Sequence, residues 1–85
     1  MYKREEALEW VQEVLSNEIT DSLTLYNAAC FYSMAGDIEK SLDTLSRGID
    51  AGDRDADWWR QDGDLDNVRN DPRFDELLQR MEACN

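Results

Sequence analysis

The sequence predicts an all-α domain of antiparallel helix-turn-helix units, and three observations lead to this prediction. Apolar residues recur at spacings of three and four in four separate stretches, which is the period of an amphipathic helix. No stretch shows the alternation of apolar and polar residues that is typical of a half-buried strand. The first and third stretches also align at a constant offset of 34 residues, from Glu5 on Glu39 to Leu15 on Ile49.

The first expected helix covers residues 2–16. Its apolar face carries Leu8, Val11 and Leu15, and helix-forming glutamates fill much of the opposite face. Trp10 falls on the polar side of this helix, where a further repeat or a second copy of the chain could contact it.

The second expected helix covers residues 22–35, and Thr20, Asp21 or Ser22 can serve as its N-cap. This helix is apolar nearly all round, so it should be covered on more than one side. Gly36 ends it, because glycine readily takes the positive φ found just after a helix.

The third expected helix covers residues 38–51, with Asp37 as its N-cap and Gly52 as its stop signal. A glycine inside a helix costs about 1 kcal/mol relative to alanine. Gly48 is therefore predicted to let a neighbouring helix approach closely. The apolar stripe of this helix consists of Ile38, Leu42, Leu45 and Ile49.

The remaining residues predict short helical turns near 56–69 and a terminal helix over 72–83. Asp71 is the expected N-cap of the terminal helix, and Pro72 suits its first position. At least one ring of the Trp58-Trp59 pair is expected to plug the end of the core, although an exposed pair could be an interaction hot spot. The terminal helix carries apolar residues at helical spacing: Phe74, Leu77, Leu78 and Met81.

The segment from Leu25 to Leu45 resembles one repeat of the tetratricopeptide family, which also has a period of 34 residues. Gly48 and Asp53 depart from the family pattern, which usually has alanine and proline at these positions. The resemblance implies a right-handed solenoid of about four helices plus the short turns. The fitting residues are Leu25, Ala28, Ala29, Tyr32, Gly36, Asp37, Ser41 and Leu45.

The closing part of the chain is similar to segments that end bacterial arrays of this family with a helix beginning Asp-Pro-Arg-Phe. We therefore expect a single domain over residues 1–85. Residues 1–20 would supply the second helix of a partial repeat, residues 21–54 one complete repeat, and residues 55–85 the closing segment. The missing first helix suggests excision from a longer array, or coverage of the open end by a second copy.

Charge limits the choice of partner. The chain has nine Lys and Arg residues against 20 Asp and Glu residues, a formal net charge of -11. It should repel phosphate backbones and anionic lipids, so neither nucleic acid nor a membrane is an expected partner. A basic or apolar protein segment is favoured instead. The acidity could also serve solubility alone or reflect a salt-rich cytoplasm, and a cytoplasmic location is the default expectation.

No catalytic, cofactor or zinc pattern emerges. Histidine is absent, and Cys30 and Cys84 are the two cysteines, expected to be free thiols. Abundant carboxylates are not arranged in an evident acid–base pair, so an enzyme is not expected. Asp53, Asp55 and Asp57 resemble the start of a calcium loop, but the glycine and glutamate required later are missing. Helix capping by these aspartates is the alternative.

The family resemblance implies a concave groove lined by the first helix of each repeat, and hence a non-catalytic protein–protein interaction module. Asn27 would hold the backbone of a bound peptide through its amide. The side chains implied to line the groove could instead pack on the first helix or on the closing segment. The alternative function is a homo-oligomeric structural unit joined through the open end at the first helix. The implied groove residues are Leu23, Tyr26, Asn27, Cys30, Ser33 and Met34.

Overall fold

The computed structural model describes Glu9 and residues 21–83. The expected first helix therefore lies, apart from Glu9, outside the described residues, and so does Trp10. The described part is helical and contains no strand, which confirms the all-α prediction. Its elements are α2 (Ser22–Met34), α3 (Ile38–Asp50), α4 (Ala56–Gln61), a 3-10 turn η1 (Gly63–Leu65), α5 (Asp66–Arg69) and α6 (Pro72–Ala83).

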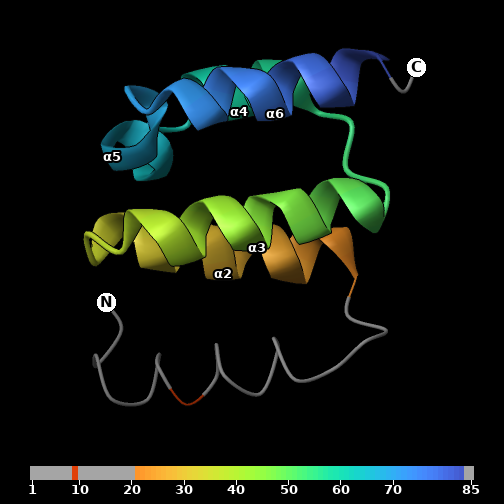
Figure 1. Cartoon of the computed structure of the whole chain (residues 1–85). Coiled ribbons are helices and arrows are strands. Elements are labelled where there is room, and N and C mark those ends of the chain that lie inside the picture. The colour runs from red at the N-terminus through yellow and green to blue at the C-terminus, as the bar shows by residue number, and fades with distance from the viewer. Residues whose placement is uncertain (1–8, 10–20, 84–85) are drawn as a thin grey trace.

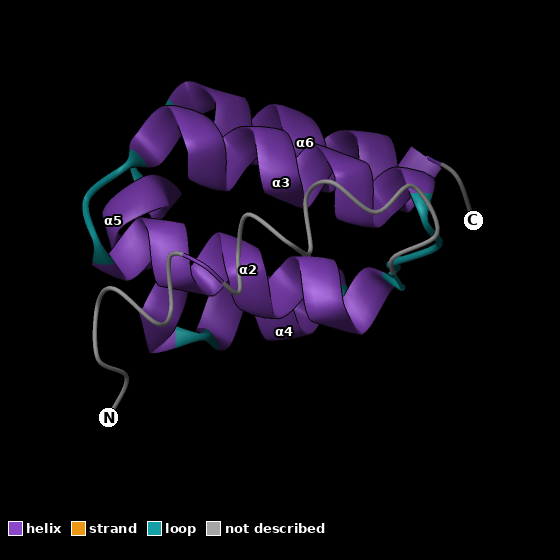
Figure 2. Ribbon diagram, turned by 90° about the horizontal axis from the view of Figure 1, so that it is seen from below, coloured by secondary structure: helices purple, strands orange, loops and turns teal. Residues whose placement is uncertain are grey.

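The long helices lie in two layers. One layer is the antiparallel pair α2 and α3, and the other contains α4 and α6 (Figures 1 and 2). Helix α3 packs against both α2 and α6, while η1 and α5 pack against α2. The closing segment thus covers one side of the α2–α3 pair.

Aspartates cap the starts of α2 and α3, and a glycine follows the end of α2. Asp21 is the N-cap of α2, since its carboxylate accepts a hydrogen bond from the Thr24 amide at 2.7 Å. Asp37 caps α3 in the same way. Gly36 has a φ of 82°, and the chain reverses there between α2 and α3.

The main core lies between the two layers. Trp59 is only 1% exposed and stacks at a tilt between Tyr26 and Phe74, with ring centroids 6.2 and 6.1 Å apart. This confirms that one ring of the tryptophan pair plugs the core. The aliphatic residues buried around this aromatic row include Leu42, Leu45, Ile49, Leu65, Val68, Leu78 and Met81.

Helix α2 is buried on two sides, as its apolar circumference predicts. Tyr26, Ala29 and Cys30 belong to the main core. Leu25, Ala28 and Tyr32 form a second buried cluster, against which Phe31 packs. A helix with two buried sides cannot show the single apolar stripe of a surface helix.

The expectation for Gly48 needs correction. Gly48 is buried against α2, but a Cβ built on it would lie 3.9 Å from Leu25 Cβ and 4.0 Å from Ser22 O. These are ordinary van der Waals distances, so the packing of α2 on α3 does not require a glycine there. Gly48 keeps the conformational cost of a helical glycine without a steric need for it.

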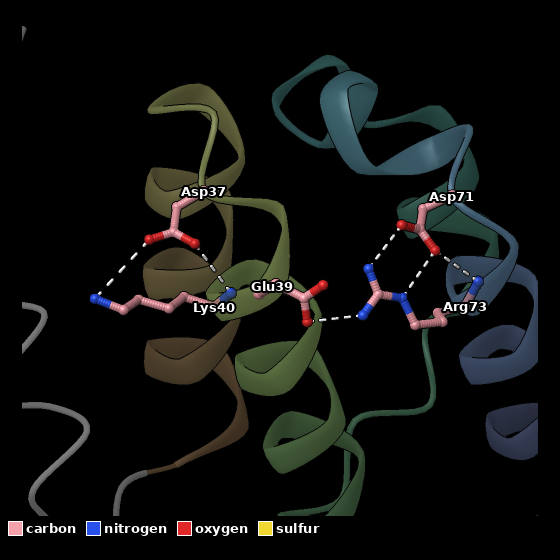
Figure 3. Close-up of polar contacts among 5 residues, drawn as sticks. All are labelled: Asp37, Glu39, Lys40, Asp71 and Arg73. Carbon is pink, nitrogen blue, oxygen red and sulfur yellow. Dashed lines mark hydrogen bonds and ion pairs between the residues drawn. The ribbon is translucent and has the colours of Figure 1, made fainter.

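Arginines on α6 tie the closing segment to α3. Arg73 donates to Asp71 at 3.0 and 2.9 Å and to Glu39 on α3 at 2.7 Å, as Figure 3 shows. Arg80 donates to Ser46 at 2.8 Å and also bonds Asp50. Three tertiary contacts join residues 34 apart in sequence: Ser33 with Asn67, Glu39 with Arg73, and Ser46 with Arg80.

Candidate functional site

A cavity of about 490 Å³ lies between α2 and the closing segment. Pockets of this size can take a small ligand or a side chain. Four of the six side chains predicted to face a groove line it, namely Leu23, Tyr26, Asn27 and Cys30. The other lining residues are Ser22, Asp53, Asp55, Trp58, Trp59, Asp62 and Asp64.

Exposed apolar side chains border this cavity. Leu23 on α2 is 68% exposed and Trp58 on α4 is 53% exposed. Trp59, by contrast, also lines the cavity but is almost wholly buried. Large exposed apolar side chains beside a concave surface are typical of interaction sites.

Tyr26 and Cys30 are held by Asp62 rather than exposed. The Tyr26 hydroxyl donates a short hydrogen bond to Asp62 Oδ2, and the Cys30 thiol lies 4.0 Å from the same oxygen. Burial, and then the bond to Asp62, raises the pKa of Tyr26 above its ordinary value. Burial likewise raises the pKa of the Cys30 thiol to about 12. Both groups therefore stay protonated at neutral pH, and Cys30 is a poor nucleophile.

Asn27 is exposed on the cavity wall, and its amide makes no hydrogen bond to another described residue. Ser33 and Met34 do not line the cavity. Ser33 is fully buried, and its carbonyl accepts from the Asn67 amide at 2.7 Å. Met34 is exposed at the other end of α2.

Four aspartates surround the cavity: Asp53, Asp55, Asp62 and Asp64. None of them takes part in an ion pair within the described part of the chain. Their hydrogen bonds are to uncharged donors instead. Asp53 accepts from the Trp59 indole at 3.1 Å, and Asp55 caps α4 through the Trp58 amide at 3.2 Å.

The sequence prediction did not include Asp62 and Asp64 in the site. Both follow the tryptophan pair in a stretch dense in aspartates. That density is the one feature of the sequence that could have indicated an acidic site here. Their position against α2 depends on the turn at η1, where Asp62 Oδ1 accepts from the Asp64 amide at 3.0 Å. Apolar spacing predicts a turn here but does not fix its direction.

The calcium-loop resemblance finds no support in the arrangement of its aspartates. Asp55 serves as a helix cap, and Asp57 pairs with Arg60 on the same helix at 3.3 Å. Another trio, Cys30, Asp62 and Asp64, brings its potential ligand atoms within 4.8 Å of one another. Its thiol is held protonated by burial and its Asp62 is engaged by Tyr26, so it is a poor metal site.

The fold and cavity define a small all-α unit with an acidic, partly aromatic cavity. The chain is 35% identical over 83 residues to a protein of Arabidopsis thaliana that is named as chloroplastic. The match covers 94% of this chain and 25% of that protein, so the chain spans about a quarter of the relative's length. No protein-family model matches the chain, and no solved structure matches it. None of the described helices is both long and apolar enough to cross a membrane.

Proposed function

We propose that this chain is a non-catalytic protein–protein interaction module that binds a segment of another protein in the cavity between α2 and the closing segment. The observation that carries the proposal is the pair of exposed apolar side chains, Leu23 and Trp58, on the rim of that cavity. Exposed tryptophan beside a concave surface is a recurrent binding anchor. Asn27 would hold the backbone of the bound segment.

We further propose that the unit is the end of a tetratricopeptide-type array. The antiparallel α2–α3 pair, its Gly36-Asp37 turn and the tertiary contacts between residues 34 apart support this assignment. In this proposal α4, η1 and α5 stand where another repeat would begin, and α6 lies beside α3 as a closing helix. The cytoplasmic location expected from the sequence stays a prediction, because the relative in Arabidopsis thaliana is named chloroplastic.

A peptide-display selection tests the binding function. The chain is used as bait for random peptides of about a dozen residues, and synthetic copies of the selected peptides are measured by calorimetry. Binding should weaken at least about tenfold in Leu23→Ser and in Trp58→Ala, since each removes an exposed anchor. Met34→Ser is the matched control, because it removes an exposed apolar side chain from α2 outside the cavity.

Peptides that bind all three variants equally would place binding elsewhere and contradict the proposal. The second candidate function is self-association, because the same exposed Leu23 and Trp58 could bury each other across a dimer. Light scattering separates the two candidates. A dimer that Leu23→Ser and Trp58→Ala disperse, but Met34→Ser preserves, would favour self-association over peptide binding.

A further inference from the structure

The cavity combines two kinds of surface that a bound group could cover, namely exposed apolar side chains and carboxylates. Its rim carries exposed apolar surface at Leu23 and Trp58, and its wall carries four carboxylates without a cationic partner among the described residues. Arginines lie nearby, but their charges are used elsewhere. Arg60 pairs with Asp57 and Glu82, and Arg69 pairs with Asp66.

The two arginines that approach this region from the closing segment and its preceding loop contact backbone instead of the cavity carboxylates. Arg69 donates to the carbonyls of Trp59 and Asp62 at 3.1 and 2.6 Å. Arg54 donates to the carbonyls of Ile49 and Asp53 at 2.9 and 2.6 Å. The cavity carboxylates therefore produce a negative potential that can attract a cationic group of a bound partner.

We propose that the cavity receives an arginine or lysine side chain of the bound segment. This inference rests on the proposed peptide site and names the chemistry that the site selects. The aliphatic stem would lie along Leu23 and the exposed ring of Trp58, and the cationic head would face Asp64 and the neighbouring carboxylates. A cation over a tryptophan ring gains additional electrostatic stabilisation.

A side chain fits the cavity better than a bare metal ion does. The thiol of Cys30 is held protonated, and Asp62 already accepts from the Tyr26 hydroxyl and the Asp64 amide. The exposed indole of Trp58 and the side chain of Leu23 offer nothing to an inorganic cation. They offer contact area to a hydrocarbon stem, and Asn27 on the same wall offers an amide to the adjoining backbone.

The test uses two short acetylated peptide amides on the full chain. Each has glycine and leucine on both sides of a central residue, which is arginine in one and its uncharged analogue citrulline in the other. Binding is followed by nuclear magnetic resonance through the indole signal of Trp58, assigned with Trp58→Ala. At low salt the arginine peptide should bind at least about fivefold more tightly, and added salt should reduce the difference.

Two variants locate the charge. Asp64→Asn should weaken binding of the arginine peptide about threefold or more, because it removes one negative charge that faces the cationic head. Binding of the citrulline peptide should not change. The fold should also be unaffected, because the Asp64 carboxylate accepts no hydrogen bond from a described residue. Asp43→Asn is the control, since it removes one exposed carboxylate from α3 outside the cavity. Equal loss in both variants would indicate a general charge effect and overturn the inference.

The failure of this inference can be told apart from failure of the binding function. Equal binding of the arginine and citrulline peptides at the Trp58 signal overturns the cationic preference and leaves the peptide site in place. The absence of any shift with the arginine peptide also overturns it. Whether the peptide site itself fails is decided separately by the display-selected peptides and their response to Leu23→Ser.

Discussion

The hydroxyl of Tyr26 donates a hydrogen bond to the carboxylate of Asp62, a residue 36 positions later that ends α4. This bond joins α2 to the closing segment at the edge of the cavity. Tyr26 is 7% exposed, and its ring also lies against Trp59. The bond therefore fixes the wall of the candidate site as well as the packing of the two layers.

Removing this hydroxyl should lower stability. Tyr26→Phe keeps the ring packing but removes a donor to a charged acceptor, which ordinarily contributes about 1.5–3 kcal/mol. We expect the free energy of unfolding, measured by urea denaturation, to fall by about 1.5 kcal/mol. A double-mutant cycle with Asp62→Asn should give a favourable coupling energy between the two positions. Additive single effects would show that the contact contributes nothing to stability.

Gly48→Ala should stabilise the chain. Gly48 lies inside α3, and the added methyl group would meet its nearest neighbours at 3.9 and 4.0 Å. The expected gain in the free energy of unfolding is about 0.5–1 kcal/mol, because alanine loses less conformational entropy in a helix. The measurement is again urea denaturation.

Gly36→Ala provides the matched comparison for this substitution. An added Cβ at Gly36 meets nothing within 4 Å, but the φ of this residue is 82°. The substitution should therefore destabilise by about 1–2 kcal/mol through backbone strain alone. The two substitutions should therefore shift the urea midpoint in opposite directions. A shift in the same direction would mean that packing, rather than backbone conformation, determines the effect at one of the two positions, and would contradict the prediction.

Much of the secondary structure could be predicted from capping residues and apolar spacing. Helix α2 ends at Met34, one residue before the expected end, and α4 (Ala56–Gln61) lies within the stretch 56–69 that was expected to form short helical turns. Both depend on local chemistry that the sequence displays directly. The choice of Asp21 over its neighbours as N-cap was not predictable, since all three candidates can accept the required hydrogen bond.

The relation of α6 to α3 was not evident from the repeat overlay, for a physical reason. Helices α3 and α6 are linked by contacts between residues 34 apart, but their apolar stripes differ in phase. Ile38, Leu42 and Leu45 match Phe74, Leu78 and Met81 only at an offset of 36, since 74 − 38, 78 − 42 and 81 − 45 each equal 36. The core-facing side of α6 is set by what it covers, not by the repeat period.

The candidate site was predictable in part. The helical positions of Leu23, Tyr26 and Asn27 place them near one another on α2 whatever surrounds the helix. The burial of Ser33 was not predictable, because α2 is covered on two sides and its polarity pattern does not distinguish them. Asp62 and Asp64 were missed because their position depends on how η1 turns back onto α2.

Acid should weaken the link between α3 and α6 through Arg73. Hydrogen bonding to Arg73 lowers the pKa of Asp71 to about 2 and lowers the pKa of Glu39 below its ordinary value. A carboxylate whose pKa is lower in the folded state stabilises the fold above its unfolded pKa. This stabilisation should therefore be lost as the pH falls from about 4 to about 2.

The measurement for this prediction is the urea midpoint as a function of pH. Arg73→Gln should flatten its decline between about pH 4 and pH 2, because it removes the guanidinium group that is the largest cause of both lowered pKa values. Arg80→Gln is the control, since Arg80 ties α6 to α3 through Asp50 and Ser46 instead. An acid decline that is the same in Arg73→Gln as in the unsubstituted chain would contradict this assignment.

Cys30 should react slowly with thiol reagents while the chain is folded. It is buried against Asp62, and burial raises the pKa of its thiol to about 12, so little thiolate is present at neutral pH. In a Cys84→Ser background, alkylation by iodoacetamide near pH 8 should be at least about a hundredfold slower in the folded chain than in urea. Cys30→Ala in the same background gives the reagent blank. Folded-state alkylation at the rate of an exposed thiol would mean that Cys30 is open to the cavity, and that Asp62 and Tyr26 do not close this wall of the site.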